Sequence, residues 1–530
     1  MSLDPLHPPK TSGAGTAPVS WAAQVAVPRY LTLREGHRPI IVVAPHGGRR
    51  LRPIRRGDSV NDLYTAEMAA HLAERLGAHA IINGGLDRNE IDLNRISHLA
   101  AKAPEVLALL LTAIDAAGAG GEVPLVLFVH GWNMVLACCD VGVGLRRRGP
   151  RLSGRHPTLS RGRFEGTIAD LEHEMAARQL TASIGRRYAA SGRDNAAQLF
   201  SGRHHDHEDA LVARLARLSL GGRVDAAQLE LGIALRWPGW RRDACIDAIV
   251  AALEPRAGSG RLPVAPARNW LEAPIGEEEP AAPLERGFSL QAVLQRDGSA
   301  ALFCGVEATS AHSMAARFCF VFADGTMMLL VGEGDWDGRA GHYSLEGASW
   351  VSSPDAGRIR ISIRAPFIRY PTHDAYLDLE AGLSRAELVD AQVELSYEAS
   401  AEKHGRLHGH VVFDGRRMDI GAVAFTDRGG RRGGDASRVR VFAAAADETM
   451  IVAVRDDTLE ICDAEDGTAV IRTIPELAAP LREARIIARV PVWRPLGEGR
   501  FARWTFGIAQ CRLGAGDEWV AGLFDSLEIF

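Results

Sequence analysis

The sequence predicts an α/β domain with a mainly parallel sheet, followed by an all-β domain of barrel-like or sandwich-like type. Three observations carry this prediction. In the first half of the chain, short apolar runs alternate with helical patterns, which is typical of a parallel sheet with flanking helices. From about residue 286 onward, short alternating segments separated by turn dipeptides replace that pattern. The length of 530 residues is also too great for one compact domain.

The α/β domain is expected between residues 25 and 255. A β-branched apolar run, Ile40–Ala44, predicts its first strand. A helix follows around 63–77, where apolar residues stand at helical spacing and Gly77 gives the stop signal. The same alternation continues with a short strand at 80–82, a helix at 105–117, strands at 125–129 and 229–235, and a helix at 242–253.

Residues 140–225 interrupt the alternation with a stretch rich in Arg, Gly and His. A segment of this length inside a domain predicts a lid or a substrate-binding insertion. It ends in His204-His205-Asp206-His207, which we interpret as a surface loop because adjacent residues seldom point to one centre. Residues 1–24 are expected to be a flexible N-terminus, and the Pro- and Glu-containing residues 256–285 a linker.

The all-β domain is expected to span residues 286–530. Turn dipeptides such as Asp324-Gly325 and Asp414-Gly415 separate its alternating segments. Strands are predicted at 315–322, 326–331, 358–363, 392–397, 410–413, 438–442 and 450–454, and one helix at 476–483. Its tryptophans are expected to pack in the core, although they could also line a cavity; they include Trp336, Trp350, Trp493 and Trp504.

Composition excludes several classes of protein. The net charge of −5 argues against a dedicated nucleic-acid binder, because such domains are usually basic. Seven cysteines without a C-x-x-C pair indicate reduced thiols and hence a cytoplasmic protein. The sequence shows neither a signal peptide nor an apolar run long enough to span a membrane. We therefore expect no nucleic-acid or membrane partner, while the oligomeric state stays open.

Polar residues follow the predicted parallel strands, where α/β sheets place their sites. The segments are Pro45-His46-Gly47-Gly48, residues 87–95, His130-Gly131-Trp132-Asn133, and Glu230 inside the last predicted strand. Two imidazoles and an acid can hold zinc with one position open, and a further carboxylate can take a proton from water. Each histidine alone is more often structural, but a buried Glu needs a partner or a function.

These segments resemble the N-formylglutamate amidohydrolases, zinc hydrolases of the wider zinc-carboxypeptidase-like fold. The resemblance rests on residues 43–48, followed by Arg88 and by Ile91-Asp92-Leu93-Asn94-Arg95. The run 62–69 is also similar to a stretch of the related poly-γ-glutamate hydrolases. The resemblance covers residues 38–255, less than half of the chain.

The resemblance implies a role for each matching residue. His46 and His130 would be zinc ligands and Asp62 the acidic ligand, with Asp58 and Glu67 as alternatives. Glu230 would be the general base. The substrate would be held by Arg88, Asn94, Arg95 and Arg236, although Arg236 could equally be a solvent-facing charge. Relatives often carry an acid before the second His, where this chain has Val129, so a group that orients His130 must come from elsewhere.

The function that the sequence favours is a zinc-dependent amidohydrolase. Its substrate would be an N-formyl or N-acyl amino acid, or a related carboxylate-bearing small molecule or peptide derivative. One alternative is a degenerate scaffold whose β domain binds an apolar ligand, because 404–410 and 421–429 faintly resemble the lipocalin-like domains of hydroxyneurosporene-synthase and AttH type. A serine α/β-hydrolase is less favoured, since no G-x-S-x-G motif follows the His-Gly pair at 130–131.

Overall fold

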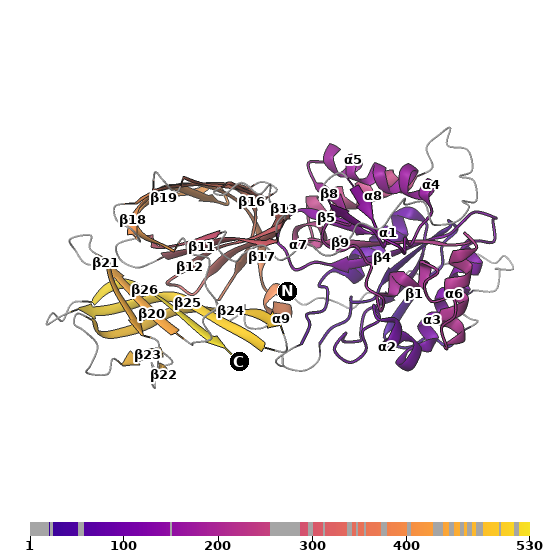
Figure 1. The fold of residues 1–530 in the computed structure, drawn as a ribbon, viewed down its shortest axis with the longest axis horizontal. Coiled ribbons are helices and arrows are strands. Elements are labelled where there is room, and N and C mark those ends of the chain that lie inside the picture. The colour runs from indigo at the N-terminus through magenta and orange to yellow at the C-terminus, as the bar shows by residue number, and fades with distance from the viewer. Residues whose placement is uncertain are drawn as a thin grey trace, which may run out of the picture.

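The computed structural model describes Trp21, residues 25–50, 58–148 and 151–254, and, between short gaps, residues 287–529. Helices and a mixed sheet occupy residues 25–254, which we call the α/β half, and strands dominate residues 287–529, the β half. Figure 1 shows the α/β half on the right and the β half on the left. The predicted succession of an α/β region and an all-β region is therefore confirmed. The expected linker and most of the expected flexible N-terminus lie outside the described residues.

A seven-stranded sheet forms the centre of the α/β half, in the order β1-β3-β2-β4-β9-β5-β8. The neighbours β3, β2, β4 and β9 run parallel to one another. By contrast, β1 is antiparallel to β3 and β5 is antiparallel to β9, while β8 runs parallel to β5. The bounds are β1 (Leu31–Arg34), β2 (Ile40–Ala44), β3 (His79–Asn83), β4 (Leu125–Gly131), β5 (Cys138–Gly142), β8 (Thr181–Ile184) and β9 (Asp225–Leu231).

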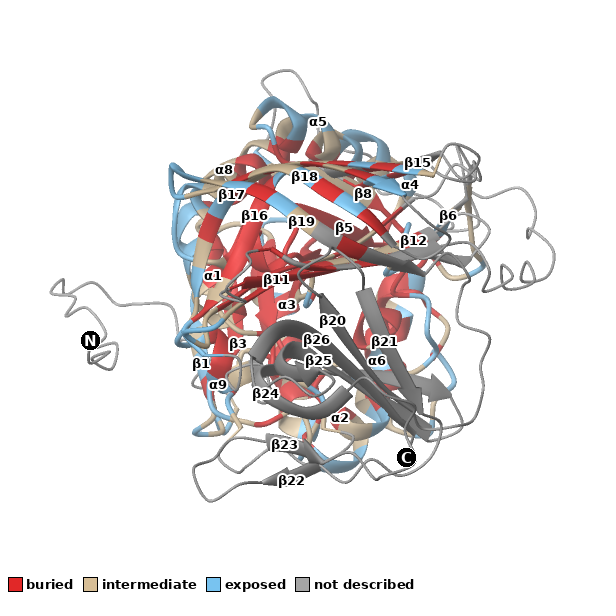
Figure 2. Cartoon of the chain, turned by 90° about the vertical axis from the view of Figure 1, so that its left-hand side faces the viewer, coloured by how far each residue is buried: buried red, intermediate tan, exposed pale blue. Residues whose placement is uncertain are grey.

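Helices cover both faces of this sheet. One face packs against α1 (Thr65–Leu76), α5 (Ala169–Ala177) and α8 (Trp240–Leu253), and the other against α2 (Ile96–Lys102), α3 (Pro104–Ala117) and α6 (Ala210–Leu220). Strand β2 is buried along its whole length, with alternate residues in the two cores, which is why it reads as a continuous apolar run. Figure 2 shows this buried interior in red.

Helix α1 illustrates how local sequence sets an element. Met68, Leu72 and Leu76 are buried on one side of it. Gly77 ends the helix in the left-handed conformation, with φ of 61°, and its N–H donates to the carbonyl of Ala73. The helix predicted at 63–77 is confirmed.

Two predictions for the α/β half are wrong in part. The strand predicted at 229–235 is β9, which ends at Leu231, and the apolar residues after it form the short helix α7 (Ile233–Arg236). A Cβ at Gly232 would lie 2.1 Å from the carbonyl oxygen of Leu136, so the chain turns there against another loop. Residues 140–225 are not an insertion throughout, because β8 is a strand of the main sheet beside β5. Strand β8 has only four residues, mostly half-buried, and therefore gives no strong apolar pattern.

The β half contains two antiparallel sheets. In the larger one, the pairing of β13 with both β12 and β16 closes the run from β13 to β16 into a ring, which confirms a barrel-like sheet. Its strands are β10 (Gly287–Val293), β11 (Ala300–Ser310), β12 (Ser313–Phe322), β13 (Met327–Asp335), β14 (His342–Leu345), β15 (Ala348–Ser353), β16 (Arg358–Tyr370), β17 (Glu387–Ala399), β18 (His404–Phe413) and β19 (Arg416–Asp427).

The second sheet has the order β21-β20-β26-β25-β24-β23-β22. Its strands are β20 (Arg438–Ala444), β21 (Met450–Arg455), β22 (Ile461–Asp463), β23 (Ala469–Arg472), β24 (Leu481–Gly497), β25 (Arg500–Leu513) and β26 (Trp519–Ile529). Most of the helix predicted at 476–483 lies outside the described residues, and its last part, from Leu481, belongs to β24.

Aromatic side chains pack inside the larger sheet. Phe318, Phe320 and Phe367 are fully buried, with ring centroids 5.1–6.4 Å apart. Trp350 is also fully buried in this core, as expected for a packing role, and side chains at 336, 493 and 504 lie outside the described ones. No helix among the described residues is long and apolar enough to cross a membrane.

The two halves share a hydrophobic core at their boundary. Val135 and Leu136, in the loop after β4, are buried among residues of the larger β sheet. The N–H of Val135 donates to the carbonyl of Val331 in β13 at 2.9 Å. From the β half, Glu380 in the short helix α9 (Leu379–Leu383) accepts hydrogen bonds from the Arg50 N–H and from Asn61 Nδ2. The loop after β4 therefore links the sheet of the α/β half directly to the β half.

Candidate metal centre

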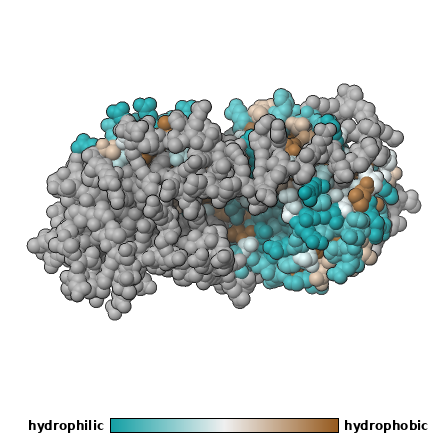
Figure 3. Space-filling view, viewed as in Figure 1, coloured by the Kyte–Doolittle hydropathy of each residue, from teal (hydrophilic) through white to brown (hydrophobic). Residues whose placement is uncertain are grey.

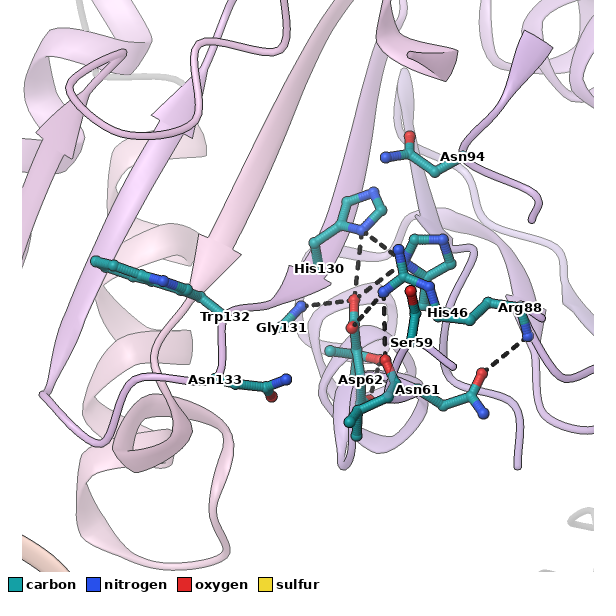
Figure 4. Close-up of polar contacts among 12 residues, drawn as sticks. His46, Ser59, Asn61, Asp62, Arg88, Asn94, His130, Gly131, Trp132 and Asn133 are labelled. Carbon is teal, nitrogen blue, oxygen red and sulfur yellow. Dashed lines mark hydrogen bonds and ion pairs between the residues drawn. The ribbon is translucent and has the colours of Figure 1, made fainter. Parts of the chain in front are cut away.

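Three side chains converge at the carboxyl edge of the parallel strands (Figure 4). His46 follows β2, His130 lies near the end of β4, and Asp62 precedes α1. His46 Nδ1 is 3.2 Å from both Asp62 Oδ2 and His130 Nδ1, and His130 Nδ1 is 3.4 Å from the same carboxylate oxygen. All three residues are buried. The structure thus brings together His46, His130 and Asp62, and neither Asp58 nor Glu67 joins the group.

The donor set fits a tetrahedral zinc ion. Ligand bonds of about 2.0–2.2 Å arranged as a tetrahedron put neighbouring donor atoms about 3.3–3.6 Å apart. The three separations here, 3.2, 3.2 and 3.4 Å, are close to that spacing. Two imidazoles and one carboxylate are also the ligands of catalytic zinc sites that keep a fourth position open. Within the described ranges, this is the only group of His, Cys, Asp or Glu side chains close enough to hold a metal ion.

Asp92 contacts the opposite edge of the His46 ring. Its Oδ1 is 2.6 Å from His46 Nε2, and the backbone N–H of Asn94 donates to the same oxygen at 2.9 Å. Burial alone would raise the pKa of Asp92, but the hydrogen bond and charge of His46 hold that pKa below its usual range. A carboxylate on the second ring nitrogen fixes the tautomer and orientation of a metal-binding histidine. Asp92 belongs to the motif on which the family resemblance rests, but the sequence analysis predicted no role for this residue.

Asp62 is anchored from two sides. The Gly131 N–H donates to its Oδ2 at 2.9 Å, and Arg88 Nη1 donates to its Oδ1 at 3.3 Å. A Cβ at Gly131 would lie 2.4 Å from Arg236 Nη1 and 2.9 Å from the Cβ of Asp62, so glycine permits this close approach. Burial alone would raise the pKa of Asp62, but the two imidazoles hold it well below its usual range.

Glu230 lies beside His130 on the neighbouring strand. The register pairs His130 of β4 with Glu230 of β9, so the two side chains project from the same face. The carboxyl group is 7% exposed, and its Oε1 accepts a hydrogen bond from Gln228 Nε2 at 2.6 Å. Burial, and then the negative charge of Asp62, raises the pKa of Glu230 to about 8. A carboxyl group of this basicity can exchange a proton with water near neutral pH.

Arg88 and Arg95 both contact Asp92 but differ in exposure. Arg88 Nη2 is 3.7 Å from Asp92 Oδ2, and with its bond to Asp62 this guanidinium lies between two carboxylates. Arg95 Nε is 3.4 Å from Asp92 Oδ2, and its side chain is 60% exposed. Arg95 is therefore more accessible to a substrate than Arg88, whose side chain is 23% exposed.

Arg236 is buried at the site, and its role in substrate binding stays a prediction. Its side chain is 1% exposed, so it is not a solvent-facing charge. Its guanidinium donates to the backbone carbonyls of Leu63 and Trp132 and to Asn133 Oδ1. The two terminal nitrogens of the guanidinium are therefore engaged by the loops around the site, whereas its Nε has no hydrogen-bond partner among the described residues.

The buried polar atoms at the site that have no hydrogen-bond partner among the described residues include His130 Nε2 and Asn94 Oδ1. Figure 4 shows Asn94 on the side of the His130 ring that faces away from Asp62. Because Val129 stands where relatives often carry an acid, another group was expected to orient the His130 ring. No described residue forms a hydrogen bond with His130 Nε2. These two atoms offer a hydrogen-bond donor and an acceptor to a bound molecule.

The histidine cluster at 204–207 is part of a folded turn. The ring Nε2 of His204 is 2.9 Å from the carbonyl oxygen of Arg193, and the rings of His204 and His207 meet edge to face at 5.7 Å. His204 is buried rather than exposed, since it packs against the residues around Arg193. The cluster is not among the groups that could hold a metal ion.

The sequence analysis did not predict the contacts that Trp132, two residues after His130, makes with Arg187 and Tyr188. The Arg187 guanidinium lies 4.5 Å from the ring centre of Trp132, and the Tyr188 ring meets Trp132 edge to face at 5.5 Å. Asp140 holds this segment by accepting the N–H groups of Arg187 and Tyr188 at 2.8 and 2.6 Å. Partial burial, and then the charge of Glu230, raises the pKa of Tyr188, which is 39% exposed. No local motif marks these contacts, because Asp140 reaches 48 residues along the chain.

Comparisons with known proteins give only distant likenesses. The chain matches no protein-family model and no curated protein. It is similar to an AttH-like protein from Nitrosomonas europaea (12% identity, 45% of this chain and 91% of that chain, TM-score 0.27). It is also similar to N-formylglutamate amidohydrolase from Ralstonia eutropha JMP134 (13% identity, 42% of this chain and 94% of that chain, TM-score 0.27). A third similar structure is kievitone hydratase from Nectria haematococca (8% identity, 46% of this chain and 88% of that chain, TM-score 0.25). Scores this low carry no inference about activity.

Proposed function

We propose that the protein is a zinc-dependent amidohydrolase that cleaves the amide bond of an N-formyl or N-acyl amino acid or a related carboxylate-bearing substrate. The observation that carries this proposal is the buried group of His46, Asp62 and His130, with Glu230 on the adjoining strand. When bound, zinc supplies a positive charge that polarises a carbonyl group and lowers the pKa of water to about 7.

Residues of the protein transfer the proton, bind the substrate and hold the metal-binding side chains in place. Glu230 accepts a proton from the attacking water and donates it to the leaving nitrogen, a transfer that suits a carboxyl group with a pKa of about 8. Arg95, the exposed arginine, binds the substrate carboxylate. Asn94 Oδ1 accepts a hydrogen bond from the substrate. Arg88 keeps Asp62 and Asp92 in place rather than binding substrate.

The proposal extends to organisation. The α/β half would be a zinc-carboxypeptidase-like domain within residues 25–255, and the β half a second domain within 286–530. Glu380 supports this arrangement because it reaches from the β half to Asn61, the neighbour of Asp62. The substrate would be a small molecule or a peptide derivative in the cytoplasm.

The rival functions have less support. A serine hydrolase needs a serine hydroxyl next to the catalytic imidazole, whereas the polar contacts of the His130 ring are with His46 and Asp62. A binding scaffold needs an open cavity in the β half, whereas Trp350 and the phenylalanines fill the described core of its larger sheet. Both rivals predict a chain without a metal requirement.

Metal analysis tests the proposal directly. The purified protein is expected to contain about one zinc ion per chain by plasma mass spectrometry. The His130→Ala variant is expected to lose it, and His71→Ala, which removes an exposed imidazole from α1, is expected to keep it. Folding of each variant is checked by circular dichroism. Wild-type protein that stays free of metal after zinc supplementation contradicts the proposal.

Activity provides the second test. N-formyl and N-acetyl amino acids are screened for release of the free amine. Glu230→Gln, which preserves shape but cannot accept the proton, is expected to lower kcat by about 10²–10⁴-fold while zinc stays bound. Full activity in this variant would remove Glu230 from the mechanism.

A further inference from the structure

A cavity lies at the open end of the hairpin formed by β6 (Arg146–Arg148) and β7 (Arg151–Ser153), where Arg146 pairs with Ser153. Its volume of about 360 Å³ is within the range of about 300–1,000 Å³ that small-molecule sites occupy. The polar side chains that line it are Arg146, Arg155, Arg203, His156, Ser153 and Ser191, and we call it the arginine pocket.

The arginine pocket has an unbalanced positive charge. Its lining contains three guanidinium groups, which stay protonated, and no acidic side chain. Burial lowers the pKa of His156, and every charged group that lowers it further is a cation, Arg203 and Arg155 foremost. Arg147, next in the chain to Arg146 but not part of the lining, instead pairs with Glu172 at 3.6 Å. Cations gathered in this way repel one another unless an anion binds between them.

The lining chemistry favours a phosphate group over a carboxylate. A phosphate monoester carries close to two negative charges and three acceptor oxygens, whereas a carboxylate carries one charge and two oxygens. Three guanidiniums can form paired hydrogen bonds with phosphate oxygens, and the hydroxyl of Ser191 adds a further donor. Arg203 is already oriented, because its Nη1 donates to the carbonyl of Ser191 at 3.4 Å.

One segment joins the arginine pocket to the metal centre. Residues 188–195 begin at Tyr188, which contacts Trp132, and end at Asn195, which forms a β-bridge with Arg95. Ser191, in the middle of this segment, lines the arginine pocket. The ends of the segment therefore contact Trp132 and Arg95, which border the metal centre, and its middle lines the arginine pocket.

We propose that the arginine pocket binds a phosphate group, either as free phosphate or as the phosphoryl part of a small organic molecule. The site is separate from the zinc ligands, so its occupancy does not depend on the metal or on the proposed hydrolysis. A phosphoryl ligand would fix Ser191 and with it the segment that borders Tyr188 and Arg95.

Isothermal titration calorimetry on the full-length protein tests this site, with inorganic phosphate and glycerol 3-phosphate as probes and with acetate and glycerol as controls. Both phosphates are expected to bind and both controls to fail. Arg155→Gln and Arg146→Gln change exposed side chains, so both variants should fold, and each is expected to weaken phosphate binding by about tenfold or more. Arg34→Gln, which removes an exposed arginine from β1, is expected to bind like the wild type.

The outcomes separate the two phosphate sources and the two proposals. Tighter binding of glycerol 3-phosphate identifies an organic phosphate as the ligand, and equal binding identifies phosphate itself. His130→Ala is expected to keep phosphate binding even though it loses zinc, so failure of one proposal does not imply failure of the other. Absence of binding by both phosphates, or unchanged binding in Arg155→Gln and Arg146→Gln, overturns the inference.

Discussion

His46 is held by carboxylates at both ring nitrogens, Asp62 at 3.2 Å and Asp92 at 2.6 Å. A proton on the nitrogen that faces Asp92 would leave the other nitrogen free to present its lone pair to the space between Asp62 and His130, where a metal ion would bind. Asp92 is therefore placed to orient the His46 ring without touching that space.

Replacing Asp92 tests this role. Asp92→Ala is expected to weaken zinc binding by about 10–100-fold, because the ring of His46 loses its orienting carboxylate. Competition with a zinc-sensitive chelating dye measures the affinity. Asp115→Ala, which removes a carboxylate that is 55% exposed, serves as the matched control and should bind zinc like the wild type. Equal affinities for the two variants would refute the orienting role.

Glu230 links the site to pH-dependent stability. Its pKa is raised from 4.5 to about 8 in the folded protein, so the folded state keeps a proton that the unfolded state releases. In metal-free protein, the free energy of unfolding is therefore expected to fall as pH rises from about 5 to 8 and to level off above that. Glu230→Gln lacks this titration, and its stability advantage over the wild type should grow across the same pH window. Urea unfolding at several pH values measures the difference, and a constant difference would contradict the buried, protonated state.

The positions of individual site residues could be predicted from the sequence where those residues follow or end a recognisable apolar strand. His46, His130 and Glu230 each follow or end an apolar strand, and the parallel order of those strands brings them to one edge. Trp132 and Tyr188 could not be predicted as partners, because their contact depends on how Asp140 folds a distant segment. The position of Arg236 could not be predicted, since sequence spacing does not tell which side of a short helix faces the site.

At the scale of elements, apolar runs and glycine stops predicted β2, α1, β3, α3, β4 and α8 within a few residues. They did not predict the short or half-buried elements, such as β1, β8 and α2. Residues 233–235 continue the apolar run of β9, but the chain turns into a helix after Gly232, which lies close to the Leu136 carbonyl. That neighbour is almost one hundred residues away along the chain, so the local sequence does not reveal it.

The end of β4 gives a prediction at this scale. Gly131→Ala would place a methyl group against Arg236 and Asp62, both of which are buried, so the site loops must shift. A destabilisation of about 1–3 kcal/mol is expected, as for other overpacked sites, together with weaker zinc binding. Thermal unfolding and the dye competition measure the two effects. Gly84→Ala adds the same methyl group where no atom lies within 4 Å and should leave both quantities unchanged; a similar response in the two variants would contradict the steric argument.

At the scale of the whole molecule, the sequence predicted an α/β half and a β half but not the contacts between them. The bonds of Glu380 to Arg50 and Asn61 connect residues more than three hundred positions apart, and the three residues form no motif together. The loop 132–136 likewise reads as an ordinary connection after a strand, although it carries apolar residues into the core of the β half. Figure 3 shows that the coloured surface of the α/β half is mostly hydrophilic, with scattered hydrophobic patches.

Leu136 is the residue at which the contact between the halves can be tested. It is 1% exposed, and its Cδ1 lies so close to Gly332 that a Cβ there would be only 2.6 Å away. Leu136→Ala leaves a cavity between the halves, and a destabilisation of about 2–5 kcal/mol is expected. The matched variant Leu220→Ala changes a side chain that is 51% exposed and should alter stability by no more than about 0.5 kcal/mol. Urea unfolding followed by tryptophan fluorescence compares them. Because Leu136 belongs to the loop that continues from His130, Leu136→Ala is also expected to weaken zinc binding. If the variant loses stability but keeps its zinc affinity, the contact between the halves does not support the metal centre.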